Sequence, residues 1–72
     1  MVKESYAQHK DDKFLTQLRI TDKKWIVHIR HIQSTSVEPL YSASGNSNSH
    51  DSAKESAILI APILLEQAKL LL

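Results

Sequence analysis

Residues 14–32 read FLTQLRITDKKWIVHIRHI, and this stretch decides the fold. Apolar and polar side chains alternate along both of its halves, which is the pattern of half-buried β-strands. β-Branched and aromatic residues dominate, as strands favour. The link Thr21-Asp22-Lys23-Lys24 is turn-like. The stretch therefore predicts a β-hairpin over residues 13–33.

The register of this hairpin is the same for a two-residue turn and for a four-residue loop. It places the apolar partners on one face, which supports the pairing: Ile20 opposite Trp25, Leu18 opposite Val27, and Thr16 opposite Ile29. The other face mixes cations with aliphatic side chains: Arg19 opposite Ile26, Gln17 opposite His28, Leu15 opposite Arg30, and Lys13 opposite Ile32.

The sequence on either side of the hairpin is polar. Residues 1–12 predict a flexible arm, because little in them could be buried. Residues 34–51 predict a polar connector, in which a short edge strand through residues 40–42 would give the hairpin the third strand that it needs for stability. Residues 42–52 are rich in Ser and Asn and contain the only glycine, so they predict a solvated loop.

Residues 52–72 predict one long apolar helix. Ser52 and Glu55 have the spacing of a capping box, and Pro62 predicts a kink or a break. Seven apolar residues are expected to cover the sheet: Ala57, Ile60, Ala61, Leu64, Leu65, Ala68 and Leu71. The expected fold class is α+β, a small antiparallel hairpin or three-stranded meander followed by this helix on its Trp25 face, in a single small domain.

More of this helix is apolar than one small sheet can cover. Leu59, Ile63 and Leu70 lie to one side of the predicted buried face and would form an exposed apolar patch. Such patches mark interfaces, and a chain of 72 residues has only a marginal core of its own. We therefore expect self-association through these three residues, most simply as a homodimer.

The residues that could carry chemistry do not form a catalytic or metal-binding pattern. The chain has no cysteine, which removes disulfides, thiolate metal sites and cysteine nucleophiles. His28 and His31 are three residues apart and so point to opposite faces of a strand. The Ser, His and Asp residues at 47–51 fit a turn and helix cap better than a catalytic triad. No glycine-rich phosphate loop is present. We expect no enzymatic activity, no cofactor and no metal.

The bulk properties of the chain select neither nucleic acid nor membrane. The net charge is +1. The longest apolar run, Ala57 to Leu65, is far shorter than the roughly 20 residues that a membrane-spanning helix needs. The N-terminal residues do not resemble a secretory signal. We expect a cytoplasmic protein without a membrane span.

Two functions fit these observations. The first is a small protein-binding module without catalysis, acting as a regulator, inhibitor or assembly subunit, with its partner-binding residues on the mixed sheet face: Arg19, Lys24, Ile26, His28 and Arg30. The alternative is a nucleic-acid-binding protein that tracks phosphates with the basic residues of that face: Lys13, Arg19, Lys24, His28 and Arg30. The aromatics that stack bases in single-strand binders argue against the alternative, because Phe14 and Trp25 point to the opposite face.

Overall fold

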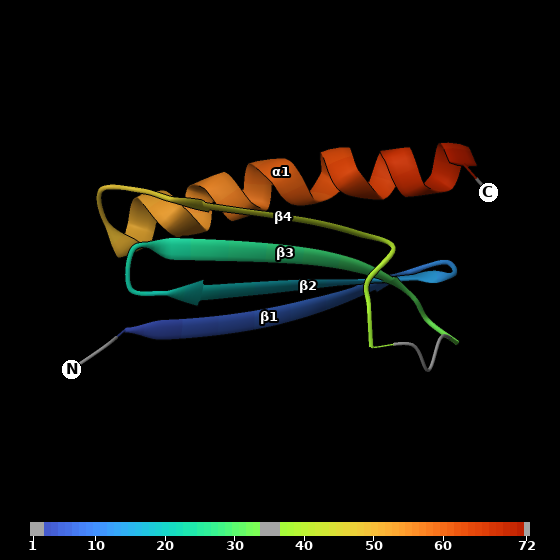
Figure 1. Ribbon diagram of the computed structural model, residues 1–72, viewed down its shortest axis with the longest axis horizontal. Coiled ribbons are helices and arrows are strands. Elements are labelled where there is room, and N and C mark those ends of the chain that lie inside the picture. The colour runs from blue at the N-terminus through green and yellow to red at the C-terminus, as the bar shows by residue number, and fades with distance from the viewer. Residues whose placement is uncertain (1–2, 34–36, 72) are drawn as a thin grey trace.

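The structure, a computed structural model, describes residues 3–33 and 37–71. It contains four strands and one helix in the order β1 (Glu4–Asp11), β2 (Phe14–Thr21), β3 (Lys24–His31), β4 (Tyr41–Asn46) and α1 (His50–Leu71). The strands pair antiparallel in sequence order, and α1 lies along one face of the sheet (Figure 1). The predicted α+β meander with a C-terminal helix is confirmed, with one strand more than expected.

The hairpin of β2 and β3 has the predicted register, with Leu18 opposite Val27 and Thr16 opposite Ile29. Its turn consists of Asp22 and Lys23 alone. Asp22 has a φ of 56°, in the left-handed region that Asp tolerates better than most residues. The Asp-Lys pair therefore makes a tight turn without glycine.

Strand β1 lies where the sequence predicts a flexible arm. It pairs with β2 along all eight of its residues. The two strands are joined by another two-residue Asp-Lys turn, in which Asp12 has a φ of 54°. Six of its eight residues are exposed. Among the described residues, the backbone of α1 comes close to β2, β3 and β4 but not to β1, which α1 contacts through side chains at its two ends. Since the helix does not lie over β1, this strand can form without the apolar alternation that marks β2 and β3.

Strand β4 extends the predicted edge strand into the stretch expected to be a loop. Its inner face carries Gly45, which lies directly opposite Trp25. A Cβ atom at position 45 would lie 2.8 Å from a ring carbon of Trp25, closer than atoms can approach. Glycine therefore makes room for the indole ring across β4. The Ser-rich sequence predicted a solvated loop, but its first residues form a strand.

The core lies between α1 and the inner face of β2, β3 and β4. Its buried apolar residues are Phe14, Ile20, Val27 and Ile29 from the strands and Ala53, Ala57, Ala61 and Ala68 from the helix. Of the other residues predicted to cover the sheet, Ile60, Leu64 and Leu65 are half-buried. The placement of Leu71 was wrong, because it is 72% exposed. A helix of 22 residues is about 33 Å long and extends past strands of six to eight residues that span about 20–27 Å.

The start of α1 also differs from the prediction. The helix begins at His50, and the Ser49 hydroxyl oxygen accepts a hydrogen bond of 3.1 Å from the Ser52 backbone N–H. Ser49 is therefore the N-cap, which makes the predicted capping box from Ser52 to Glu55 wrong. Pro62 does not divide the helix, which runs unbroken from His50 to Leu71.

Candidate interaction surfaces

The outer face of α1, which points away from the sheet, carries several large apolar residues. Five aliphatic side chains of α1 are between 56% and 83% exposed: Ile58, Leu59, Ile63, Leu70 and Leu71. Of these, Leu59, Ile63 and Leu70 lie on the side facing away from the sheet, Ile58 borders the groove toward β1, and Leu71 lies past the end of the sheet. The residues that α1 buries completely against the sheet are all alanines. An amphipathic helix of a monomeric domain has the opposite arrangement, with large apolar residues inside and polar residues outside. The three residues predicted for self-association all belong to this exposed set.

The open face of the sheet, on the side away from α1, holds the second candidate surface. A shallow hollow of about 190 Å³ on it is lined by Tyr6, Gln17, Arg19, Ile26 and His28. Three of the five residues predicted to bind a partner (Arg19, Ile26 and His28) thus meet at one place. Lys24 and Arg30 share this face, because positions 24, 26, 28 and 30 of β3 are each two residues apart.

A chain of hydrogen bonds crosses this open face from β3 to β1. Arg30 Nε donates to Gln17 Oε1 at 2.8 Å, Gln17 Nε2 donates to the Tyr6 hydroxyl at 3.0 Å, and the Tyr6 hydroxyl donates to Gln8 Oε1 at 3.3 Å. Arg30 Nη1 also donates to a backbone carbonyl oxygen, that of Val37, at 2.8 Å. The side chains of this face are therefore held in place by one another.

The second arginine of the open face is paired with an acid. Arg19 Nη2 lies 3.1 Å from Glu4 Oε1, and both groups are more than half exposed, so water screens the attraction. Because Arg19 and Arg30 both have partners within the molecule, a phosphate ligand would have to compete for them. A phosphate-tracking surface is therefore weaker here than the sequence suggested.

Tyr6 is the residue of this surface that sequence reasoning missed. It lies on β1 directly opposite Arg19, and it could not be placed while residues 1–12 were interpreted as an arm. The missed signal is the turn: Asp12-Lys13 repeats the Asp22-Lys23 pair ten residues earlier. A second hairpin with the same turn would have placed Tyr6 on the open face.

The pKa of His28 is held below its usual value, first by partial burial and second by the positive charge of Arg30. Its cross-strand neighbours Gln17 and Ser42 carry no charge that could oppose the shift. The imidazole is therefore neutral at pH 7. The open face accordingly carries less positive charge than a count of its basic residues gives.

This shift makes stability depend on pH. The unfolded chain takes up a proton on His28 at a higher pH than the folded chain does, so stability is expected to fall as pH drops from the usual histidine range through the lowered pKa of His28. The variant His28→Gln should lose this part of the pH dependence and keep the rest. Melting temperatures of both proteins between pH 7.5 and pH 4.5 test the expectation. A difference between them that stays constant with pH would refute it.

A groove between β1 and α1 is a third surface, and it follows from the helix leaving β1 uncovered. It consists of two hollows of about 370 and 300 Å³ that share Leu18 and Ile58 in their walls. Its lining is mostly apolar, and the buried Thr16 hydroxyl in its floor has no hydrogen-bond partner within residues 3–33 and 37–71. Sequence reasoning missed this groove because its far wall is the unforeseen strand β1.

Side-chain contacts at the two ends of α1 fix the helix relative to β1. At the start, the Asp22 carbonyl oxygen can only accept, so His50 Nδ1 donates to it at 2.9 Å. His50 Nε2 then accepts from the Ser5 hydroxyl at 2.9 Å. His50, expected in a loop cluster, is thus an anchor for the helix N-terminus.

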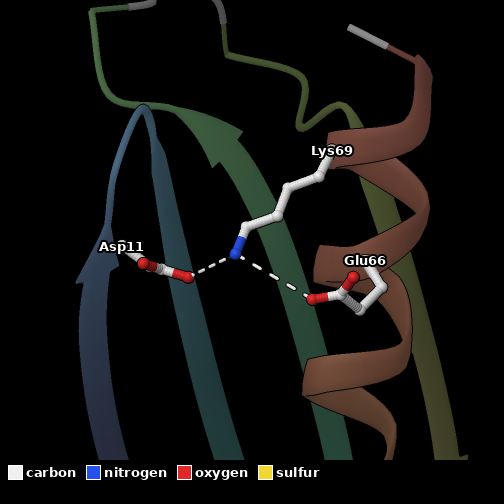
Figure 2. A network of polar contacts seen from close by, with 3 residues as sticks. All are labelled: Asp11, Glu66 and Lys69. Atoms are coloured by element: carbon white, nitrogen blue, oxygen red, sulfur yellow. Dashed lines mark hydrogen bonds and ion pairs between the residues drawn. The ribbon is translucent and has the colours of Figure 1, made fainter.

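The contact at the other end of α1 is an ion pair (Figure 2). Lys69 Nζ donates to Asp11 Oδ2 at 2.7 Å and lies 3.9 Å from Glu66 Oε1. The hydrogen bond lowers the pKa of Asp11 and raises the pKa of Lys69. The pair therefore stays charged across the physiological range and ties the last turn of α1 to the hairpin of β1 and β2.

Comparisons with other proteins give no information on the function of these surfaces. The sequence matches no protein-family model, and comparison with curated proteins and with solved structures gave no match. Within residues 3–33 and 37–71, no cluster of three or more His, Asp or Glu side chains could hold a metal ion. In the same residues, no helix is long and apolar enough to cross a membrane.

Proposed function

We propose that this chain is a small protein-binding module that acts without catalysis and self-associates through the outer face of α1. The observation that carries the proposal is the arrangement of α1, which buries alanines against the sheet and leaves Leu59, Ile63 and Leu70 exposed. Burying a large aliphatic side chain is worth roughly 1.5–3 kcal/mol. A second chain is the simplest source of that burial, because a two-fold contact needs only one kind of surface.

The open sheet face has a separate role in this proposal. A dimer formed through the outer face of α1 leaves the opposite face of each sheet exposed. Arginine beside aliphatic side chains, as Arg19 lies beside Ile26 around the hollow, suits the core of a protein interface. A regulator, inhibitor or assembly subunit of this design would dimerise on one side and contact its partner on the other.

The mass in solution tests self-association. Sedimentation equilibrium of the unmodified chain is expected to give about twice the 8.2 kDa of one chain. The triple variant Leu59→Gln, Ile63→Gln, Leu70→Gln should sediment as a monomer and keep its circular dichroism, since the three side chains are more than half exposed. Each substitution alone is expected to weaken the dimer about tenfold or more, which corresponds to about 1.4 kcal/mol.

The matched control is Ile58→Gln. Ile58 is 60% exposed, much like Leu59 at 68%, but it borders the groove toward β1 rather than the proposed contact. This variant should retain the dimer, while Leu59→Gln weakens it. A chain that is monomeric at every concentration, or a triple variant with unchanged mass and melting temperature, contradicts the proposal.

Nucleic-acid binding is the competing function. Tyr6 supplies an aromatic ring on the open face, which the sequence appeared to lack, but Arg19 and Arg30 both have partners within the molecule. Anisotropy of a labelled single-stranded oligonucleotide separates the two functions. Binding that is strong at low salt and lost at high salt, as phosphate contacts require, would favour nucleic acid over a protein partner.

A further inference from the structure

The exposed apolar residues of α1 belong to a longer stripe with regular spacing. Residues alternately four and three positions apart lie on one side of a helix, as in the seam of a coiled coil. On α1 this stripe consists of Ser52, Ser56, Leu59, Ile63, Glu66 and Leu70. The two serines are half-buried and the other four residues are exposed. None of the six belongs to the buried core.

This stripe is complementary to itself when two helices run antiparallel. Its six members form three pairs that are symmetric about Ala61: Leu59 with Ile63, Ser56 with Glu66, and Ser52 with Leu70. A two-fold axis at Ala61 therefore sets Leu59 against the partner's Ile63, two large side chains at the centre of the contact. It also sets each long Leu70 against the small Ser52 of the partner subunit. The side chains are thus complementary in size in this register.

The polar positions favour the same orientation. In the antiparallel register the Glu66 carboxylate meets the partner's Ser56, whose hydroxyl can donate a hydrogen bond to it. A parallel pair would instead place Glu66 against the partner's Glu66. The dipoles of two helices also favour the antiparallel arrangement.

We infer that two copies of this chain pack their α1 helices antiparallel about a two-fold axis at Ala61, in the order sheet, helix, helix, sheet. The inference rests on the proposed self-association and adds the orientation and register of the second chain. Because each sheet lies on the far side of its own helix, the two open faces point in opposite directions. The dimer is thus a bivalent unit that offers the same surface twice.

Cysteine cross-linking tests this register cleanly, because the chain has no cysteine of its own. The single variants Ser52→Cys and Leu70→Cys are prepared separately and oxidised alone and as an equimolar mixture. In the antiparallel register two copies of position 52 are 18 residues apart along the seam, about 27 Å, far beyond the reach of a disulfide. Positions 52 and 70 of different copies lie side by side.

The expected result is a disulfide-linked dimer in the mixture and none with either variant alone. Holding the thiols together makes their reaction effectively intramolecular, so cross-linking of the mixture should be faster than that of each variant by on the order of tenfold or more. The pair Ser56→Cys and Glu66→Cys is a second test of the same register. It covers the case in which one substitution disturbs the fold, which circular dichroism monitors.

Each other outcome has a definite meaning. Cross-linking of Ser52→Cys with itself shows a parallel pair and overturns the inference. Cysteine variants that sediment as dimers yet cross-link in neither mixture also overturn the register, while the proposed self-association stands. Chains that remain monomeric at every concentration overturn both.

Discussion

Replacing Ile29 with alanine is expected to lower the free energy of unfolding by about 2–5 kcal/mol. Ile29 is fully buried in β3 and lies between Thr16 of β2 and Tyr41 of β4. A 72-residue domain has a total stability of only about 4–11 kcal/mol, at about 0.05–0.15 kcal/mol per residue. The truncation should therefore remove a large share of it. Urea unfolding at one fixed protein concentration, followed by circular dichroism, measures the loss.

The control for this variant is Ile26→Ala in the same strand. Ile26 carries the same side chain but lies on the open face and is only half-buried. Its truncation leaves no closed cavity, because solvent reaches the vacated space, so the cost should be clearly smaller. Equal losses for the two variants would mean that the core does not lie between β3 and α1.

The hairpin of β2 and β3 could be predicted down to its register. Both strands are covered by α1 on one face only, so burial forces the alternation that the sequence displays. Two turn lengths gave one register, and only that register put Leu18 beside Val27 and Thr16 beside Ile29. In these two strands, the alternation in the sequence therefore reflects the burial of one face.

The two outer strands could not be predicted in the same way, for two different reasons. β1 lies outside the cover of α1, so no apolar alternation is needed, and only its Asp12-Lys13 turn marks it. β4 is covered, but Gly45 lies under the ring of Trp25, so the large side chain of the pair comes from β3. A strand whose neighbour supplies the bulk resembles a loop in sequence.

Of the candidate surfaces, too, one could be predicted from the sequence and two could not be predicted in full. Exposure of Leu59, Ile63 and Leu70 followed from the helix alone, because a small sheet cannot cover an apolar helix on all sides. The hollow around Arg19 and the groove between β1 and α1 are formed partly by β1. Because β1 was not predicted, the residues that it contributes to these two surfaces could not be predicted either. A surface that one element carries is visible in sequence, whereas a surface shared with a polar edge strand is not.

The alanines beneath α1 lead to the second large expected effect. Replacing Ala57 with leucine should destabilise the fold by about 1–3 kcal/mol. Ala57 has no exposed surface and belongs to the row of small residues through which α1 contacts the sheet. A leucine there adds three carbon atoms where the core has no room, so the helix must move away from Val27 and Ile29 or the side chain must adopt a strained rotamer. Urea unfolding of the variant gives the cost.

The matched substitution is Gln67→Leu, which adds a leucine at an exposed position of the same helix. It should change the free energy of unfolding by no more than about 0.5 kcal/mol. If Ala57→Leu were tolerated equally well, the sheet would have space for large side chains. The exposed aliphatic residues of α1 could then turn inward, and the need for a second chain would disappear. The row of alanines through Ala57 thus lets α1 lie close to the sheet, whereas Leu59 and Ile63 lie on the opposite side of the helix, where the sheet does not cover them.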